Sequence, residues 1–282
     1  MNSVTPEELR QWAAYIKTIC GNTLDDTKGY LIESRLSSLA LETQSVNWSD
    51  LLLKVKTDTS GALRRKVING ITTNETSFFR DSAPFDLLQF KIIPEIIDKR
   101  KAQALPGKPI PIRIWSAACS TGQEVYSTAM VIREILNNDP RYDTRILGTD
   151  ISDRAVSYAS YGKYTKLEIE RGLPLLRLSR FCKADGDFWR IRDEIRAMAT
   201  FKHINLLDPF AFPAKFDLIF CRNVAIYFSE DDRKKLYDRL AGALADDGYL
   251  IIGSTESLTG LTTKYESKRY LRSVFYEKGM GG

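Results

Sequence analysis

The stretch Ile114–Ser127 reads IWSAACSTGQEVYS and decides the fold of the larger part of the chain. It begins as an apolar strand and continues through small residues to a single glycine, Gly122. An acid, Glu124, then stands at the start of an amphipathic helix. This order of strand, short turn and helix is typical of open α/β sheets, which bind ligands at the carboxyl ends of their strands.

The same turn narrows the choice of ligand. A dinucleotide site has three glycines, which let the pyrophosphate approach the backbone and the helix N-terminus. Here there is one glycine, and the carboxylate of Glu124 would repel a phosphate. A phosphate-free cation such as S-adenosylmethionine fits these residues better. An ordinary strand–helix connection without a ligand is the alternative.

The residues after this turn predict an α/β fold. Strands and helices alternate, which indicates a mostly parallel sheet with helices on both faces. A hairpin pattern at 181–192, with an Ala-Asp-Gly-Asp turn, indicates a small antiparallel insertion at about 174–200. The strands are expected at 112–117, 144–149, 200–206, 216–221, 249–253 and 271–277, and the helices at 123–136, 154–160 and 230–244.

The region before the sheet reads as helical. Thr5, Pro6 and Glu8 form a helix start, and apolar residues then recur with a helical period up to Gly21. Further amphipathic stretches predict an all-α domain over residues 1–84. Residues 85–111 are expected to form a connecting helix at about 85–101 and a linker rich in proline and glycine. The sheet domain would occupy residues 112–282.

Composition limits the classes of function. The chain has 282 residues, 43% of them hydrophobic, and a formal net charge of +5. This charge is too small and too dispersed for a nucleic-acid footprint, so no nucleic-acid partner is expected. No apolar run is long enough to span a bilayer, so membrane insertion is not expected. The first residues lack the pattern of a secretion signal, so we expect a cytoplasmic location. With four scattered cysteines and one histidine, His203, no metal site is expected.

Three further stretches place polar residues where a ligand would bind. Asp150 ends a strand in ILGTDIS, where an acid typically accepts hydrogen bonds from ribose hydroxyls. It could instead belong to a helix N-cap. The buried strand of DLIFCRNVAIYF (217–228) delivers Arg222 and Asn223 to its carboxyl end, with Tyr227 one turn later. The run ITTNETSFFRD (71–81) is either a capped helix end or a polar loop over a ligand, with Arg80 pairing an anion.

Together these stretches give the chain a family resemblance. It resembles the chemotaxis-receptor glutamate O-methyltransferases, which methylate bacterial chemoreceptors. The combination of ITTNETSFFRD with CRNVAIYF is the most specific part of this resemblance, which covers nearly the whole chain. The other matching stretches are YLIESRLS, IWSAACSTGQEVYS, GTDIS, GKYTKLEIERGLP and FKHINLLDP. One departure is GQEVYS, where many relatives have GEEPYS.

The resemblance implies roles for individual residues. Glu124 would hold the ammonium group of S-adenosylmethionine and Asp150 its ribose, while Asn205 and Leu206 would border the adenine. Tyr227 would lie beside the substrate carboxylate as a catalytic residue. A catalytic arginine is expected near the end of the connecting segment, and Arg100 is the closest match. The full set implied to contact the cofactor is Asn74, Thr76, Arg80, Glu124, Asp150, Asn205, Leu206, Arg222 and Asn223.

The implied fold is a Rossmann-like class I methyltransferase domain with a small antiparallel β insertion, preceded by the all-α domain. The implied reaction converts receptor glutamates to methyl esters and releases S-adenosylhomocysteine. A glutamate is already ionised at neutral pH, so a histidine-poor chain suffices. The partner would be the cytoplasmic helical region of chemoreceptors, with a receptor tail peptide as a further partner of the β insertion. The helix at 30–41 would either pack against the receptor through Arg35 or be internal to its domain.

Two alternatives remain at this level. One is a methyltransferase for another substrate, although the Asn/Asp-Pro-Pro-aromatic motif of amino methylases and the Pro-Cys pair of cytosine methylases are absent. The other is a non-catalytic regulator that binds the cofactor and docks on receptors. The retained Glu124, Asp150, Asn223 and Tyr227 argue against the second.

Overall fold

The computed structural model describes residues 2–279, and its first part is an all-α domain. A capping box between Thr5 and Glu8 starts the first helix, as the sequence predicts. Trp12 is fully buried at the centre of the domain, and its indole Nε1–H donates a hydrogen bond to the carbonyl oxygen of Trp48. The helices are α1 (Pro6–Cys20), α2 (Gly29–Glu42), α3 (Trp48–Thr57) and α4 (Ala62–Ile71).

The connecting helix is interrupted. The sequence predicts one helix at about 85–101, whereas the structure has α5 (Ala83–Leu87), a π turn η1 (Leu88–Ile92) and α6 (Ile93–Ala102). Pro94 is the physical reason, because its ring lacks an N–H and would clash with the carbonyl group four residues earlier in a regular α-helix. The wider π turn before it avoids that clash. The three helical segments follow one another without a gap from Ala83 to Ala102.

The larger part of the chain is built on a seven-stranded sheet in the order β6-β2-β1-β7-β8-β10-β9. The first five strands in this order are parallel, and β10 and β9 are antiparallel. This confirms the predicted α/β fold, although the sequence did not reveal β9. The strands are β1 (Ile110–Ala117), β2 (Tyr142–Asp150), β6 (Ala199–His203), β7 (Phe216–Cys221), β8 (Leu244–Ile252), β9 (Tyr265–Tyr270) and β10 (Ser273–Lys278).

Alternating side chains of β1 supply both faces of the sheet. Ile112 and Ile114 belong to the core that includes α6 and α7 (Gln123–Leu136). Trp115 and Ala117 belong to the core on the other face, which includes α12 (Glu230–Ala243). All four side chains are buried, so a one-residue shift of this strand would disrupt both cores. The remaining elements beside the strands are α8 (Asp153–Tyr161) and the short 3-10 turn η2 (Ala225–Tyr227).

The antiparallel insertion is a three-stranded sheet in the order β3-β5-β4. Its hairpin turns at Gly186, inside the predicted 181–192 segment. The sheet also includes β3, which lies before the expected start of the insertion at about 174. The elements of this β-subdomain are β3 (Lys163–Thr165), α9 (Lys166–Glu170), α10 (Leu175–Phe181), β4 (Cys182–Asp185), β5 (Phe188–Ile191) and α11 (Asp193–Arg196).

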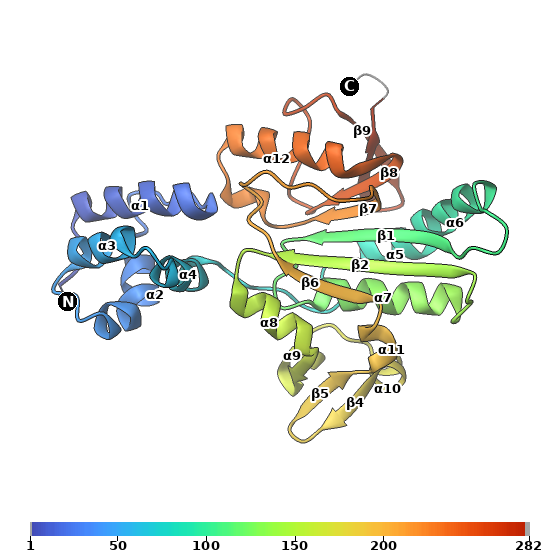
Figure 1. Ribbon diagram of the computed structural model, residues 1–282, viewed down its shortest axis with the longest axis horizontal. Helices are drawn as coiled ribbons and strands as arrows, with labels where there is room; N and C mark the ends of the chain where they lie inside the picture. The colour runs from blue at the N-terminus through green and yellow to red at the C-terminus, as the bar shows by residue number, and fades with distance from the viewer. Residues whose placement is uncertain (1, 280–282) are drawn as a thin grey trace.

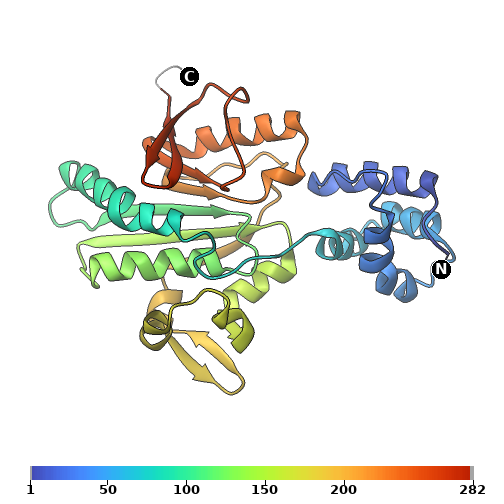
Figure 2. The same ribbon diagram turned by 180° about the vertical axis from the view of Figure 1, so that it is seen from behind.

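The helical domain lies at the carboxyl ends of the parallel strands. The arrows of β1 and β2 point toward it in Figure 1, while the β-subdomain lies at another edge of the molecule. Figure 2 shows the extended segment after α4 running from the helical domain to α5. Within residues 2–279, no helix has the length and apolar character needed to cross a membrane.

Arg100 fastens α6 to the sheet at the end opposite the helical domain. Its guanidinium donates two hydrogen bonds of 2.7 Å to the carboxylate of Asp247 and one of 2.7 Å from Nε to Asp217. The side chains of Arg100 and Asp217 are only 12% and 7% exposed. The hydrogen bond from Arg100 lowers the pKa of Asp247.

We therefore expect Arg100→Ala to lower the free energy of unfolding by about 3 kcal/mol, because it leaves a buried carboxylate without its partner. Arg145→Ala is the matched control: Arg145 also pairs with an aspartate, Asp143, but its side chain is 61% exposed. The control should lose less than about 1 kcal/mol. Urea denaturation followed by circular dichroism measures both, and equal losses would contradict a structural role for Arg100.

Candidate functional site

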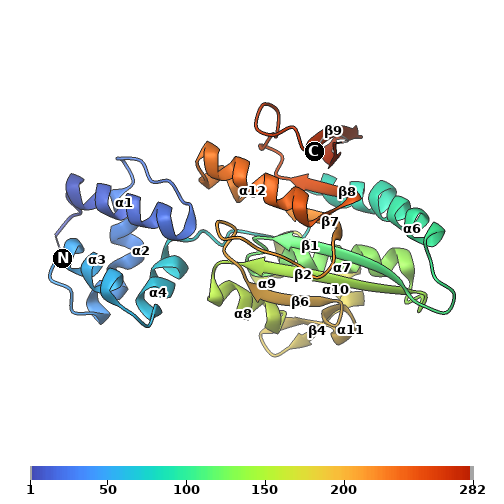
Figure 3. The same cartoon turned by 45° about the horizontal axis from the view of Figure 1, so that its top comes forward.

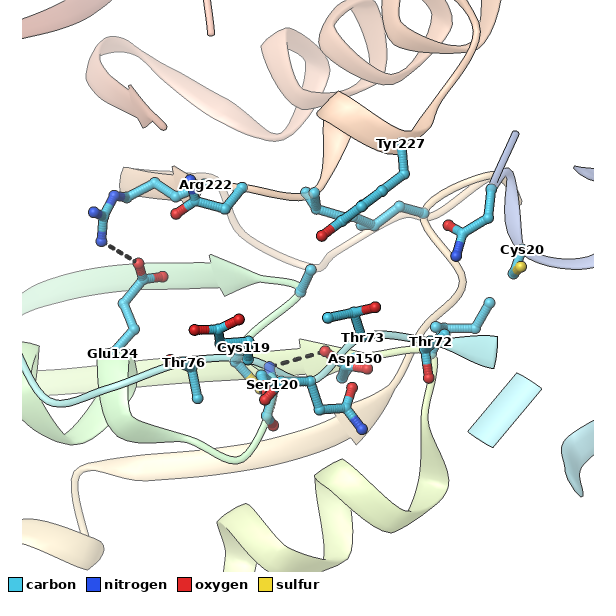
Figure 4. Close-up of a pocket in the computed structure, with 18 of the residues that line it drawn as sticks. Cys20, Thr72, Thr73, Thr76, Cys119, Ser120, Glu124, Asp150, Arg222 and Tyr227 are labelled. Atoms are coloured by element: carbon cyan, nitrogen blue, oxygen red, sulfur yellow. Dashed lines mark hydrogen bonds and ion pairs between the residues drawn. The ribbon is translucent and has the colours of Figure 1, made fainter. Parts of the chain in front are cut away.

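A cavity opens where the carboxyl ends of β1, β2 and β7 face the helical domain (Figure 4). It encloses about 920 Å³ of empty space, including the part open to solvent. Small-molecule sites typically measure roughly 300–1,000 Å³. Its walls come from the end of α1, the segment after α4, the turn after β1 and the loops after β2, β6 and β7.

All nine residues implied to contact the cofactor line this cavity, and so does Tyr227. They come from five separate segments: Asn74, Thr76 and Arg80; Glu124; Asp150; Asn205 and Leu206; Arg222, Asn223 and Tyr227. Arg100 does not line it. Its guanidinium is bound to Asp217 and Asp247 near the amino ends of β7 and β8, so the structure does not bring Arg100 together with the other predicted site residues. Arg100 is the arginine near the end of the connecting segment, but no motif surrounds it. Position alone does not distinguish a buried structural arginine from a catalytic one.

The turn after β1 adopts backbone conformations with positive φ, which residues other than glycine rarely adopt. Ala118 and Ser120 have φ values of +61° and +51°, and Gly122 has +95°. A Cβ atom on Gly122 would lie 2.8 Å from the Cβ atom of Ala159 in α8. The single glycine of the turn is thus required by close packing of α8. The strain of the turn is concentrated at the cavity, as it often is at functional sites.

Asp150 is held at the end of β2 by two backbone groups. Its Oδ2 accepts a hydrogen bond of 2.8 Å from Ser120 N–H, and its Oδ1 accepts one of 2.9 Å from Ser152 N–H. Burial raises the pKa of Asp150 above its ordinary value. The N-cap of α8 is Ser152, whose hydroxyl accepts from Ala155 N–H. Asp150 is therefore not the helix cap, and the lone pairs not used by the two amides are available to a ligand.

Glu124 is held by two side chains on neighbouring strands. Its carboxylate accepts hydrogen bonds of 2.8 Å from Ser116 Oγ and 2.9 Å from Arg222 Nη1 (Figure 4). Arg222 also donates from Nη2 to the carboxylate of Asp81 at 2.9 Å and to the carbonyl oxygen of Arg80 at 3.0 Å. The Arg222 side chain is only 3% exposed. Arg222 thus fixes the acid of the first turn and, at the same time, the segment after α4.

The run ITTNETSFFRD is the polar loop rather than a helix end. Helix α4 stops at Ile71, and the loop then crosses the cavity. Ser120 Oγ donates to the carbonyl oxygen of Asn74 at 2.9 Å, and Phe79 N–H donates to Ser127 Oγ at 3.0 Å. Phe79 and Asp81 both have positive φ values, +49° and +53°. The loop is therefore pinned to the turn and helix that carry Glu124.

Arg35 has an internal role. Its Nη1 donates to the carbonyl oxygen of Ile71 at 2.8 Å and to the hydroxyl of Thr73 at 3.2 Å. These bonds close the end of α4 and fix the first residues of the loop. Of the two readings of the helix at 30–41, the structure favours the internal one for this side chain.

The cavity suits a cation without phosphates. Three acids line it: Glu124, Asp150 and Glu75, of which Glu75 pairs with Arg171. The positive charge of Arg222 is already used by Glu124 and Asp81. Gly122 is the single glycine of the turn ACSTGQE, so no glycine-rich cradle for a pyrophosphate is present, and Ala159 packs against this glycine. Within residues 2–279, no group of three or more histidine, cysteine, aspartate or glutamate side chains is placed to hold a metal ion.

Comparison with known proteins agrees with this geometry. Residues 74–273 match the family model of the CheR methyltransferase SAM-binding domain, and residues 7–72 match that of the CheR methyltransferase all-alpha domain. The chain belongs to the CheR methyltransferase family. The protein is therefore an S-adenosylmethionine-dependent methyltransferase, and the family resemblance seen in the sequence is confirmed.

Relatives match the CheR chain along nearly its whole length. The chemotaxis protein methyltransferase of Vibrio anguillarum is 38% identical over 278 residues, which cover 98% of each chain. Chemotaxis protein methyltransferase 1 of Pseudomonas aeruginosa is 35% identical, covering 97% of this chain and 98% of that protein. The chemotaxis protein methyltransferase of Borreliella burgdorferi is 34% identical, covering 98% and 95%.

Some residues of this CheR site were missed by the sequence analysis. Cys20 and Asn22 line the cavity from the end of α1, although nothing in the sequence pattern links this helix end to the ligand. Glu256, in the loop after β8, lies behind the cavity wall. Its Oε2 accepts hydrogen bonds from Asn223 N–H at 2.9 Å and Gly253 N–H at 2.7 Å. A serine- and glycine-rich loop after a strand, GSTES, was the available signal.

Glu256 explains the conformation of Asn223. Asn223 has a φ of +57°, which turns the chain sharply after β7 and brings its side chain to the cavity. The carboxylate of Glu256 accepts a hydrogen bond from the Asn223 N–H that this turn exposes. Burial raises the pKa of Glu256. The arrangement is a strained turn held by a buried acid from another loop.

We expect Glu256→Ala to weaken binding of S-adenosylhomocysteine about tenfold, because it leaves two buried N–H groups unsatisfied at a cost of about 1–3 kcal/mol and frees the Asn223 turn. Isothermal titration calorimetry measures the affinity. Glu266→Ala is the control, since Glu266 lies on β9 and its side chain is 52% exposed. Equal affinities for the two variants would contradict this role.

Proposed function

We propose that this protein transfers the methyl group of S-adenosylmethionine to glutamate side chains of bacterial chemoreceptors, as part of chemotactic adaptation. The products are glutamate methyl esters and S-adenosylhomocysteine. In the reaction, a carboxylate oxygen forms a bond to the methyl carbon while the carbon–sulfur bond breaks. The electron pair of that bond stays on sulfur, so no proton has to move.

The observation that carries this proposal is the set of side chains in the cavity. The lining has an arginine and a tyrosine to orient an anion, but no histidine or lysine to act as a base. His203 is exposed at the end of β6, outside the cavity. Burial raises the pKa of Cys119 and Cys221 well above the ordinary thiol value, which disfavours a thiolate nucleophile. A substrate that arrives ionised needs none of these groups.

Positioning and desolvation then account for the catalysis. When bound, the cofactor supplies a methyl group made electrophilic by a positively charged sulfur. Glu124 and Asp150 would hold its ammonium and ribose groups, while Asn205 and Leu206 would border its adenine. Removal of water from the substrate carboxylate favours the reaction, because the charges of the carboxylate and the sulfonium cancel as the ester forms. Holding the two reacting groups in line supplies the rest.

Arg80 takes the role first assigned to Arg100. Arg222 is buried and fully used by Glu124, Asp81 and a backbone carbonyl. Arg80 lines the cavity, and within residues 2–279 its guanidinium has one hydrogen-bond partner, the carbonyl oxygen of Glu75. Its remaining N–H groups can bind a carboxylate. We therefore assign Arg80 to the glutamate substrate in addition to the cofactor wall.

Tyr227 is the second group for the substrate. It ends η2, directly after the strained turn at Asn223, and its hydroxyl points into the cavity in Figure 4. Its side chain is 37% exposed, so it stands near the open mouth where a protein substrate would enter. The hydroxyl can donate a hydrogen bond to the glutamate carboxylate and align it with the methyl group.

The receptor partner is proposed as the helical cytoplasmic region of chemoreceptors, which places the protein in the cytoplasm. A receptor tail peptide would bind the β-subdomain. In its three-stranded sheet, β3 and β4 are both edge strands, and an extended peptide can add to such an edge. Neither contact involves nucleic acid or insertion into the bilayer.

The deciding assay incubates the protein with methyl-labelled S-adenosylmethionine and receptor-bearing membranes. Base-labile label released as methanol is the expected result, since carboxyl methyl esters hydrolyse in base. Membranes whose receptor glutamates are changed to alanine are the control. Tight cofactor binding with no base-labile label would leave the non-catalytic regulator as the answer, and label stable to base would indicate another substrate group.

The assay also tests the two substrate residues. Tyr227→Phe should lower turnover roughly 10- to 100-fold with little change in S-adenosylhomocysteine affinity, because only the alignment of the carboxylate is lost. Arg80→Lys should raise the receptor concentration needed for half-maximal rate, because an ammonium cannot bind a carboxylate in bidentate fashion. Tyr161→Phe, at a side chain 70% exposed and outside the cavity, is the control. An unchanged rate for Tyr227→Phe would remove Tyr227 from the mechanism.

A further inference from the structure

The end of helix α1 reaches into the cofactor site. The five residues from Ile19 to Thr23, called the α1 turn below, end the first helix and lie against the loops after β6 and β7. Cys20 and Asn22 line the cavity. Figure 3 shows the end of α1 beside the start of α12, and Tyr227 lies three residues before Glu230, the first residue of that helix. The α1 turn is thus a wall of the site contributed by the other domain.

Gly21 brings the α1 turn into close contact with the loop after β7, which carries Tyr227. It caps α1 with a φ of +79°, and its N–H donates to the carbonyl oxygen of Lys17. A Cβ atom at this position would lie 2.8 Å from the ring of Phe228 and 3.1 Å from the side chain of Leu207. Phe228 is the residue after Tyr227. Only glycine allows the backbone of the helical domain to approach this closely.

Hydrogen bonds join the α1 turn to both halves of the cavity. The backbone N–H and the hydroxyl of Thr23 donate to the carbonyl oxygen of Tyr227 at 3.0 and 3.1 Å. On the other side, the buried amide of Asn205 donates from Nδ2 to the carbonyl oxygen of Ile19 at 3.2 Å. The turn therefore binds one residue from the substrate end and one from the adenine end.

Asn22 faces the space between these two contacts. Within the described part of the chain, its side chain makes no hydrogen bond, although it lines the cavity and is half-buried. An amide group has two donors and an acceptor to offer. A purine ring is a suitable partner, because its edge presents a donor and acceptors at the same spacing.

We propose that the α1 turn positions Tyr227 and closes the cofactor cavity, so that cofactor binding and docking of the helical domain on the sheet stabilise each other. Such coupling is reciprocal: the factor by which the docked arrangement strengthens cofactor binding equals the factor by which bound cofactor strengthens docking. A contact on the helical domain can then change the site without touching the cofactor. The part that concerns Tyr227 rests on the function proposed above, whereas the part that concerns cofactor binding does not.

The first test compares two glycines with the same backbone conformation. Gly107 has a φ of +73°, close to the +79° of Gly21, but a Cβ atom there would meet nothing within 4 Å. Gly21→Ala and Gly107→Ala therefore carry similar backbone strain, and only the first collides with Phe228. Titration calorimetry with S-adenosylhomocysteine should show a loss of about tenfold for Gly21→Ala and less than about twofold for Gly107→Ala. Equal affinities would overturn the proposal.

A second measurement decides the matter if Gly21→Ala does not fold. Hydrogen exchange of the unchanged protein, with and without S-adenosylhomocysteine, follows the amides of Gly21 and Thr23. Ligand should slow both, because it holds the docked state. The amide of Asp58, which donates to Lys54 at the end of α3 and lies outside the cavity, is the internal reference. If ligand slows neither Gly21 nor Thr23 relative to Asp58, the coupling does not exist.

The link to Tyr227 is tested by a double-mutant cycle on turnover at saturating cofactor. If Gly21 acts through Tyr227, Gly21→Ala should lower the rate in the unchanged protein but have little effect in the Tyr227→Phe background. Independent losses that multiply would remove this part of the proposal. The binding and exchange experiments need no receptor, so a failure of the proposed methylation would leave their outcome readable.

Discussion

The buried guanidinium of Arg222 is the interaction on which the site depends. It sits at the end of β7 and binds the carboxylates of Glu124 and Asp81 at 2.9 Å each. One of these acids begins α7, and the other ends the loop that comes from the helical domain. A single arginine thus joins the first turn of the sheet domain to the segment that covers it. Removing it would leave Glu124 buried without a positive partner, which is costly in a low-dielectric interior. The same buried arginine therefore holds both the acid that faces the cofactor cavity and the segment that comes from the helical domain.

The helical domain is a part of the catalytic unit for the same reason. Its loop is tied to the sheet by Arg222 and by the hydroxyl of Ser120, and its α1 turn is tied to Tyr227 by Thr23. Asn69 of α4 also accepts a hydrogen bond from Ser152, the cap of α8 next to Asp150. These contacts surround the cavity on several sides. Docking of the helical domain and the shape of the cofactor site therefore cannot be altered independently.

Much of the fold and the site could be predicted from local sequence. The alternation after residue 112 predicts the parallel sheet, and the hairpin turn at Gly186 predicts the β-subdomain. The residues implied by family motifs all reach one cavity. Most of them follow strand ends that meet at the same edge of the sheet, whereas Asn74, Thr76 and Arg80 come from the loop after α4. Arg100 shows the limit. It was chosen by position without a motif, and its two aspartate partners are 117 and 147 residues away in the chain. No local sequence pattern predicts that Arg100 pairs with these two aspartates.

The sequence by itself determined the order of the elements, because this order depends on periodicity and turn chemistry. The class of cofactor and the residues proposed to surround it came mostly from the resemblance of its motifs to a known family. Only the tertiary structure decided which arginine is free for a substrate, which acid holds Asn223, and that the end of α1 closes the site. These features depend on contacts between segments far apart in sequence: Glu256 with Asn223, Thr23 with Tyr227, Arg222 with Asp81. Such contacts arise from how segments distant in the chain pack together, and this packing is not visible as a periodic pattern in the sequence.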